Sequence, residues 1–245
     1  MKSDEKEPGR YQRQMLIDGW GQEGQKKLRS ATVFVAGAGG LGCPAAIFLV
    51  SAGVGRIRLC DCSEVCLTNL NRQVLYSEGD IGRQKVFAAR EALLKLNPHV
   101  DVEPLRARIT SKTVADLVGE SSLVLDCLDN FDTRHVLNDY AVHSGIPFIH
   151  AGIEGLSGQV TFIHTPETPC LYCLFPGAIP AKDVFPVAGV TPGVVGTIQA
   201  CEAIKWIVGI GENLKGKLLF WDGEIMQFQK ITVARDPDCP VCGKQ

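Results

Sequence analysis

Gly37-Ala-Gly-Gly-Leu-Gly42 is the stretch of sequence that decides the fold. It follows the apolar run Ala31–Ala36 (ATVFVA) and begins a segment, Leu41–Ala52, that has the composition of a helix. The spacing of Gly37, Gly39 and Gly42 suits a strand that turns sharply into a helix and brings backbone N–H groups close to phosphate. The stretch therefore predicts the strand–turn–helix unit of a nucleotide-binding fold.

The next strand, expected at Arg56–Cys60, ends at Asp61, where an acidic side chain can bind the hydroxyls of a ribose. Strand, helix, strand and acid are then all in place, which favours nucleotide binding over a purely structural turn. Taken alone, this arrangement would favour NAD.

The residues after Asp61 argue against NAD and for a polyphosphate. Arg72 lies among amides in Asn69-Leu-Asn71-Arg72-Gln73, and Lys85 lies in the next predicted helix. An arginine can hold phosphate oxygens with two parallel hydrogen bonds, and a lysine can act as a point charge on the same group. These residues predict a site for the triphosphate of a nucleotide such as ATP.

Polar residues also follow a later strand, Ser122–Cys127, in the order Leu128-Asp129-Asn130. A carboxylate at the carboxyl edge of a parallel sheet, facing a polyphosphate, is a natural Mg²⁺ ligand. The alternative is that Arg72 and Lys85 are solvated surface charges and that Asp129 caps the helix expected from Thr133 to His143.

Strands and helices alternate along the first part of the chain, which predicts an α/β fold with a doubly wound, mostly parallel sheet. We expect one domain over 1–245, made of an N-terminal helical segment (1–30), a Rossmann-like half (31–155) and a second half (156–245) that extends the same sheet. The remaining expected helices are 82–96 and 193–208, and the remaining strands are 100–104, 147–151, 159–164, 217–222 and 225–233.

The composition is that of an ordinary globular protein. Of 245 residues, 45% are hydrophobic and 21% are charged, and the formal net charge of −2 gives no basic field that would attract nucleic acid. The charged N-terminus does not have the pattern of a signal peptide, and the apolar stretch at 186–210 contains Pro192, Glu202 and Lys205. We therefore expect a cytoplasmic protein that has no contact with a membrane.

Ten cysteines are many for an intracellular protein, and four of them form two pairs, Cys170-Leu-Tyr-Cys173 and Cys239-Pro-Val-Cys242. Two such pairs offer four thiolates, which complete a tetrahedral shell, and zinc suits that shell best. Most of the other six, Cys43, Cys60, Cys62, Cys66, Cys127 and Cys201, lie in apolar runs and are expected to be small core residues.

Several ordered motifs together resemble one family. They are Arg10-Tyr-Gln-Arg-Gln14, the glycine loop, Asp61, Asn69–Gln73, Gly82-Arg-Gln-Lys85, Leu128–Asn130, Gly196–Glu202 and Cys239–Gly243, and they cover nearly the whole chain. The sequence is similar to the MoeB/ThiF/HesA family, the bacterial-type relatives of ubiquitin-activating enzymes. The resemblance implies an ATP-dependent adenylyltransferase that activates the C-terminal glycine carboxylate of a small ubiquitin-like sulfur carrier ending in Gly-Gly.

The resemblance also implies roles for single residues. Gly40 would pack against the nucleotide and Asp61 would bind its ribose. The triphosphate would be held by Asn69, Asn71, Arg72 and Lys85, and Thr68 and Gln73 would also belong to the nucleotide site. Asp129 would bind Mg²⁺ with Asn130 beside it. Arg13 would act across a homodimer interface on the ATP of the partner subunit.

The sequence departs from the family in one loop. Many relatives carry a reactive cysteine shortly before an Ala-Gly-Val segment, whereas Phe185 stands there in Asp183–Val190. A phenyl ring is not a nucleophile, so we expect this chain to stop at the acyl-adenylate and to leave the next step to a separate sulfurtransferase or desulfurase, or to free sulfide. Cys62, Cys66 or Cys201 are the alternatives to the absent cysteine.

Three other functions stay open on the sequence. The same fold could serve an NAD-dependent oxidoreductase. Adenylation could act on a tRNA base or a ribosomal peptide. The chain could also be a nucleotide-binding scaffold that has lost catalysis, although Arg13, Arg72, Lys85 and Asp129 argue against that.

Overall fold

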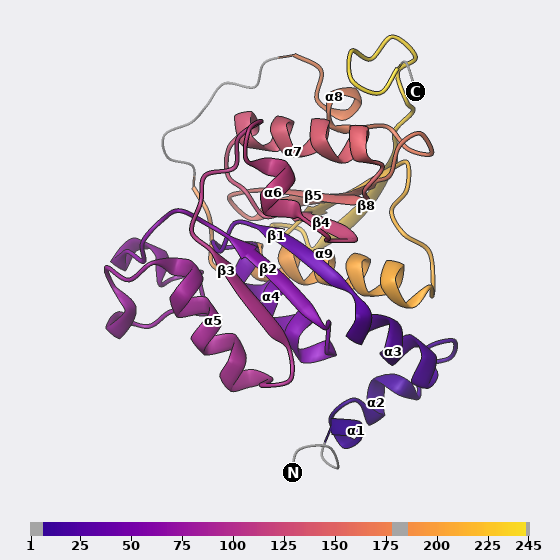
Figure 1. Ribbon diagram of the computed structural model, residues 1–245. Coiled ribbons are helices and arrows are strands. Elements are labelled where there is room, and N and C mark those ends of the chain that lie inside the picture. The colour runs from indigo at the N-terminus through magenta and orange to yellow at the C-terminus, as the bar shows by residue number, and fades with distance from the viewer. Residues whose placement is uncertain (1–6, 178–185, 244–245) are drawn as a thin grey trace.

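The computed structural model describes residues 7–177 and 186–243, in which eight strands form one sheet in the order β3-β2-β1-β4-β5-β6-β7-β8 (Figure 1). The first five strands of that order are parallel, and the last three join it by antiparallel pairing. The mostly parallel sheet and its extension by the second half of the chain are thus as predicted. The strands are β1 (Thr32–Ala36), β2 (Arg56–Cys60), β3 (Asp101–Leu105), β4 (Leu123–Asp126), β5 (Phe148–Glu154), β6 (Ser157–Ile163), β7 (Lys217–Asp222) and β8 (Gln227–Thr232).

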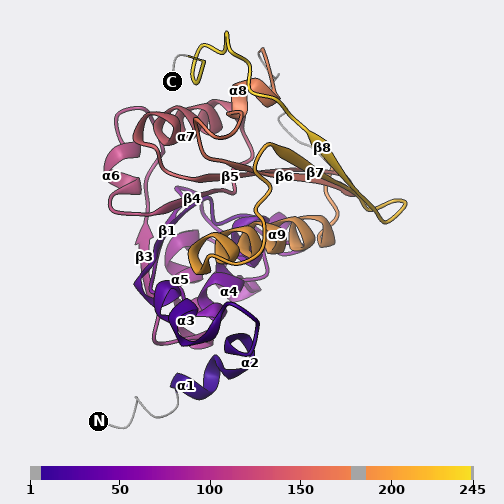
Figure 2. The ribbon, with the colours of Figure 1, turned by 90° about the vertical axis from the view of Figure 1, so that its right-hand side faces the viewer.

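Helices cover both faces of the sheet, as a doubly wound fold requires (Figure 2). One face packs against α3 (Gly21–Ser30), α4 (Gly42–Ala52), α5 (Lys85–Leu96) and α9 (Val190–Val208). The other face packs against α6 (Val114–Val118), α7 (Phe131–Ser144) and α8 (Leu171–Leu174). Two short helices, α1 (Glu7–Arg10) and α2 (Gln12–Met15), precede α3, and the 3₁₀ turns η1 (Leu67–Asn69) and η2 (Glu78–Asp80) follow β2.

Strand β1 shows why the sequence before the glycine loop is continuously apolar. Val33 and Val35 point into the core under α4 and α9, whereas Phe34 and Ala36 point into the core under α6 and α7. A central parallel strand is buried on both faces and therefore has no polar side to alternate with.

Two helices begin elsewhere than the sequence suggests. The helix expected from Gly82 begins at Lys85, because Gly82 has a φ of +83° and Gln84 is extended. The helix expected from residue 193 begins at Val190, because Pro192 lies in its first turn, where the missing N–H costs no helical hydrogen bond. Among the described residues, no helix is both long and apolar enough to cross a lipid bilayer.

The strand order reverses between β1 and β4, since β2 and β3 lie on one side of β1 and β5 lies beyond β4. Loops at the carboxyl ends of these two strands leave in opposite directions, which opens a crevice for a ligand. The glycine loop follows β1, and the segment that carries Asp129 follows β4.

Candidate nucleotide-binding site

A cavity of about 650 Å³ lies at this point of the sheet. Its wall is built by the ends of β1, β2 and β4 and by the first turns of α5 and α7. The site residues expected from the sequence that line it are Gly37, Gly39, Gly40, Asp61, Arg72, Gln73, Lys85, Asp129 and Asn130. Residues as far apart in the sequence as Gly37 and Asn130 are thus brought to one cavity of a size that suits a nucleotide.

The glycine loop needs glycine at two positions for different reasons. Gly37 has a φ of +101°, and a Cβ there would lie 2.6 Å from the carbonyl oxygen of Cys127. A Cβ on Gly42 would lie 1.9 Å from the carbonyl oxygen of Gly37, which no real structure allows. Gly42 is not among the residues that line the cavity, and its demonstrated task is to let α4 begin directly under the loop.

Asp61 is bonded to the glycine loop itself. Its Oδ2 accepts a hydrogen bond from the N–H of Ala38 at 2.9 Å, and its Oδ1 accepts one from the N–H of Ser63 at 2.7 Å. Each carboxylate oxygen keeps a second lone pair, so the side chain can still accept a hydroxyl of a ligand. The role of Asp61 in binding ribose stays a prediction, and its support of the loop is a further role that the sequence did not indicate.

Three residues predicted to bind the nucleotide, Thr68, Asn69 and Asn71, do not line the cavity. The guanidinium of Arg72 donates through Nη1 to the carbonyl oxygen of Thr68 and to Oδ1 of Asn71, both at 2.9 Å. Asn69 accepts the N–H of Cys66 at 3.2 Å and so caps η1. In this structure the three residues shape the segment that presents Arg72, and direct contact with phosphate stays a prediction for them.

Lys85 is the first residue of α5 and lines the cavity although it is only 8% exposed. Within 7–177 and 186–243, its ammonium group has no hydrogen-bond or ion-pair partner. Lys85 is therefore not the solvated surface charge of the alternative interpretation.

Asp129 and Asn130 have separate tasks. Asn130 is the N-cap of α7, and its Oδ1 accepts the N–H of Thr133 at 3.0 Å. Asp129 is exposed on the cavity wall, where its Oδ1 accepts, among the described residues, only the amide of Asn130 at 3.2 Å. The idea that Asp129 caps this helix is therefore wrong, and its carboxylate has the free oxygens that a hard cation such as Mg²⁺ prefers.

Two further cationic residues line the cavity and were missed at the sequence level, Arg108 after β3 and Arg134 in α7. Neither residue lies in a motif that the sequence analysis used. The loop after β3 brings Arg108 to the cavity, and the rotation of α7 brings Arg134 there. Arg13 is different: it is exposed on α2 and does not line this cavity. Figure 1 shows α2 beyond α3, near the amino end of β1, on the far side from the glycine loop.

The four paired cysteines come together at one point between α8 and the C-terminal tail. Their sulfur atoms all lie within 4.8 Å of one another, with Sγ of Cys170 3.6 Å from that of Cys239 and Sγ of Cys173 3.5 Å from that of Cys242. Zn–S bonds of about 2.3 Å place the sulfurs of a tetrahedral site about 3.8 Å apart. The cluster is therefore compatible with zinc.

The surroundings of Cys239 favour a thiolate. Burial raises the pKa of its thiol, but the backbone N–H groups of Cys242 and Val241 and the neighbouring thiols outweigh burial and lower the pKa to about 7. A thiolate is the form that binds a metal.

The other six cysteines divide into two groups. Cys43, Cys60 and Cys127 are buried core residues as expected, and burial raises the pKa of Cys43 and Cys60 to about 12. Cys62 and Cys66 are exposed in loops and Cys201 is exposed on α9, so half of the six, and not most of them, are core residues. Burial of its sulfur still raises the pKa of Cys201, which disfavours a nucleophilic thiolate there. Phe185, on which the absence of a catalytic cysteine rests, lies outside the described residues.

Comparison with known proteins agrees with this geometry. A Thermus thermophilus protein named sulfur carrier protein adenylyltransferase is 43% identical, over 100% of this chain and 94% of that protein. The molybdopterin-synthase adenylyltransferase of Salmonella typhimurium is 38% identical over 96% of each chain. A crystal structure of E. coli MccB with ATP has a TM-score of 0.80 and 27% identity, over 91% of this chain and 69% of that one. The ThiF family matches residues 11–241, so the chain belongs to the ThiF family.

Proposed function

We propose that this protein is an ATP-dependent adenylyltransferase that activates the C-terminal glycine carboxylate of a small ubiquitin-like sulfur-carrier protein. The relatives that match nearly their whole length are named adenylyltransferases, one for a sulfur carrier and one for molybdopterin synthase. The proposal for this chain rests on that kinship and on the charge pattern of its cavity.

One observation carries the proposal: Lys85 is almost completely buried on the cavity wall without a counter-ion among the described residues. An ammonium group on the wall of a cavity, without a counter-ion among the described residues, attracts an anionic ligand. Arg72 and Arg108 line the same cavity and can bind phosphate oxygens. The carboxylates of Asp61, Asp129, Asp132 and Glu154 line it too, so the cavity suits a polyphosphate that is accompanied by a cation.

Charge also explains the chemistry of the proposed reaction. An oxygen of the carrier's terminal carboxylate attacks the α-phosphorus of ATP, the bond from that phosphorus to the β-phosphate bridging oxygen breaks, and pyrophosphate leaves. Two anions approach each other, so fixed positive charge at Arg72 and Lys85 lowers the barrier. No general base is needed, because a carboxylate is ionised near pH 7. Mg²⁺, held by Asp129, would supply further positive charge to the phosphates.

The active unit in this proposal is a homodimer. Arg13 is exposed and remote from the cavity of its own chain, which agrees with a role at the cavity of a second copy. We also propose that the four-cysteine cluster holds zinc as a structural metal, because four protein ligands leave no position open for a substrate.

Two competing functions have less support. An NAD-dependent oxidoreductase has no need of an unpaired lysine beside Arg72 and Asp129. Adenylation of a tRNA base or a ribosomal peptide would use the same cavity. The relatives named for a sulfur carrier and for molybdopterin synthase are 43% and 38% identical to this chain, whereas E. coli MccB, which has the same fold, is 27% identical. The carrier proteins therefore remain the first substrates to test.

The decisive experiment is ATP–pyrophosphate exchange with a panel of purified small carriers that end in Gly-Gly, each with and without the terminal glycines. We expect exchange with at least one intact carrier and none with its truncated form. Asp129→Ala should abolish the exchange, whereas Asp116→Ala, an exposed carboxylate on α6 outside the cavity, should not. Exchange that persists in a folded Asp129→Ala variant would refute the assignment of this site.

A further inference from the structure

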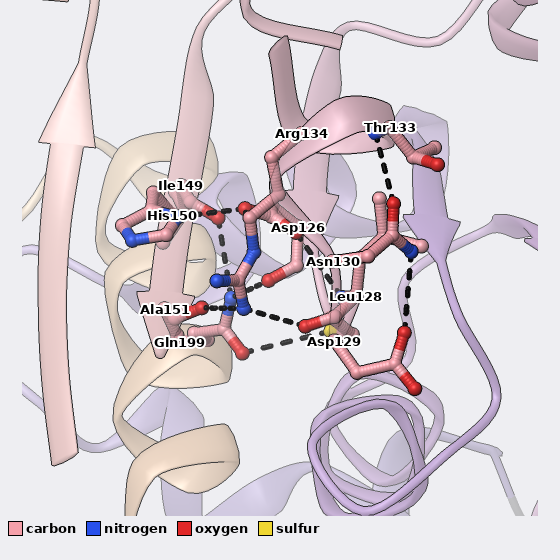
Figure 3. Close-up of polar contacts among 11 residues, drawn as sticks. Asp126, Leu128, Asp129, Asn130, Thr133, Arg134, Ile149, His150, Ala151 and Gln199 are labelled. Atoms are coloured by element: carbon pink, nitrogen blue, oxygen red, sulfur yellow. Dashed lines mark hydrogen bonds and ion pairs between the residues drawn. The ribbon is translucent and has the colours of Figure 1, made fainter. Parts of the chain in front are cut away.

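Beside Asp129 lies a buried polar network that no sequence motif indicates (Figure 3). Its centre is Arg134, which is 6% exposed and reaches from α7 towards the ends of β4 and β5. The Nη2 group of Arg134 donates to the carbonyl oxygen of Leu128 at 2.5 Å and to that of Ala151 at 2.9 Å. One side chain thus ties the residue before Asp129 to the neighbouring strand.

Asp126 binds the backbone N–H of Leu128, the residue whose carbonyl oxygen accepts from Arg134. Its Oδ1 accepts the N–H of Leu128 at 3.1 Å, so both backbone groups of Leu128 are bound by side chains. Its Oδ2 lies 2.6 Å from Nδ1 of His150 and 3.4 Å from Nε of Arg134. Asp126 and His150 are both fully buried, so the network cannot move without breaking costly contacts.

The backbone beneath this network is also fixed from the opposite face of the sheet. The side-chain amide of Gln199, on α9, donates to the carbonyl oxygens of Asp126 at 2.8 Å and of Ile149 at 3.2 Å. The burial of His150 lowers the pKa of its imidazole, although the carboxylate of Asp126 partly opposes this effect. A neutral imidazole with its proton on Nδ1 donates to Asp126 and leaves Arg134 as the single cation of the network.

Asp129 itself has little to hold it. It is exposed, and within the part of the chain that the structure describes its carboxylate has one hydrogen bond, of 3.2 Å, from the side chain of Asn130. The backbone just before it is the part that the buried network fixes, and Asn130 just after it is fixed as the N-cap of α7.

We propose that Arg134 is a positioning residue that, with Asp126 and His150, aims the carboxylate of Asp129 at the cation of a bound metal–nucleotide complex. This inference rests on the proposed function, because it gives Asp129 the role of metal ligand. It does not make Arg134 a contact of the reacting atoms. Groups behind a metal ligand commonly change metal affinity or activity by about 10- to 100-fold when they are removed.

The test compares Arg134→Met, which keeps the apolar stem and removes the donors, with a matched variant, Arg58→Met. Arg58 also donates to two backbone carbonyl oxygens, those of Leu117 and Asp116, both at 3.0 Å, but it does not line the cavity. Two quantities are measured without a carrier, the calorimetric affinity for ATP at several Mg²⁺ concentrations and the unfolding temperature. With a carrier, kcat and KM of exchange are added.

For Arg134→Met we expect the Mg²⁺ concentration at half-maximal ATP binding to rise by about 10-fold or more, and kcat to fall by about 10- to 100-fold, with a smaller change in the KM for ATP. Arg58→Met should lower only the unfolding temperature. Arg134→Lys keeps the buried charge and can reach one of the two carbonyl oxygens, so its Mg²⁺ requirement should lie between those of the wild type and Arg134→Met.

A Mg²⁺ requirement equal to that of the wild type in folded Arg134→Met would overturn the inference. If that variant does not fold, the same result in Arg134→Lys would overturn it. Because the Mg²⁺ dependence of ATP binding needs no carrier, this inference can fail while exchange is observed, and it can hold if no carrier supports exchange.

Discussion

The hydroxyl of Tyr76 donates a hydrogen bond of 2.7 Å to the carbonyl oxygen of Ala38, in the middle of the glycine loop. The backbone N–H of Ala38 donates to the carboxylate of Asp61. Both backbone polar groups of Ala38 are therefore bound by side chains from later in the sequence. Burial raises the pKa of Tyr76 far above its ordinary value, which keeps the hydroxyl protonated as a donor. The glycine loop is therefore held in place by side chains of the neighbouring segments.

Tyr76→Phe should destabilise the protein, because it leaves a buried carbonyl oxygen with only a weak contact, from the thiol of Cys43 at 3.6 Å. We expect the free energy of unfolding to fall by about 1–3 kcal/mol, measured by urea denaturation. Tyr140→Phe is the control, since the hydroxyl of Tyr140 has no hydrogen bond among the described residues. An equal loss in both variants would contradict the role of Tyr76.

Lys85→Met should separate ligand binding from stability. The ammonium group of Lys85 has no counter-ion among the described residues, so its removal should leave the free energy of unfolding nearly unchanged. The affinity for ATP, measured by calorimetry, should fall by about 10-fold or more, because a buried phosphate contact is lost. Lys95→Met, at an exposed position of the same helix, should change neither quantity. Unaltered ATP affinity in Lys85→Met would remove the main support for the proposed function.

His150 gives the stability a predictable pH dependence. Its pKa is lowered in the folded protein, mainly by burial, whereas an unfolded histidine titrates near about 6.5. Below that pH the unfolded chain binds a proton that the folded chain does not, so the free energy of unfolding decreases as the pH falls, by at most about 1.4 kcal/mol per pH unit for this group.

The pH effect can be assigned by urea denaturation between pH 7.5 and 5. His150→Asn keeps a donor for Asp126 but does not titrate, so its stability should fall less steeply below pH 6.5 than that of the wild type. His143→Asn removes an exposed histidine from α7 and should keep the wild-type slope. Parallel curves for all three proteins would show that His150 does not cause the slope.

Metal analysis of freshly purified, unoxidised protein should find about one zinc per chain. Removal of zinc by a chelator, or Cys242→Ser, should lower the unfolding temperature, because the metal would link the C-terminal tail to the segment of α8. Cys66→Ser, which alters an exposed cysteine outside the cluster, should retain the zinc. Protein that contains no zinc would refute the metal assignment.

Arg13→Ala and Asp129→Ala should each be inactive alone and active when mixed. If Arg13 serves the partner's cavity, a mixed dimer contains one site with both residues intact. Random mixing makes half of the dimers mixed, so about a quarter of the wild-type exchange activity should return. Recovery should not occur when Lys85→Ala is mixed with Asp129→Ala, because both residues line the same cavity in the same chain.

The sequence by itself was sufficient for the parallel sheet and for most of the cavity wall. Apolar runs mark the strands, the carboxyl ends of parallel strands meet at one edge, and Asp61, Lys85 and Asp129 therefore had to lie near the glycine loop. The cysteine pairs predicted the four-cysteine cluster for a similar reason, since each pair is a local unit with its own spacing.

Only the tertiary structure decided which residues support the site from behind. Tyr76, Arg134 and His150 act through contacts with segments that are 17 to 38 residues away, and such contacts depend on helix rotation and packing that no local pattern encodes. Only the tertiary structure also shows that Asn130, and not Asp129, caps α7. Because α7 begins after Asn130, the side chain of Asp129 is left free for a ligand. Local chemistry thus determined what the cavity can bind, and long-range packing determined how rigidly its residues are held.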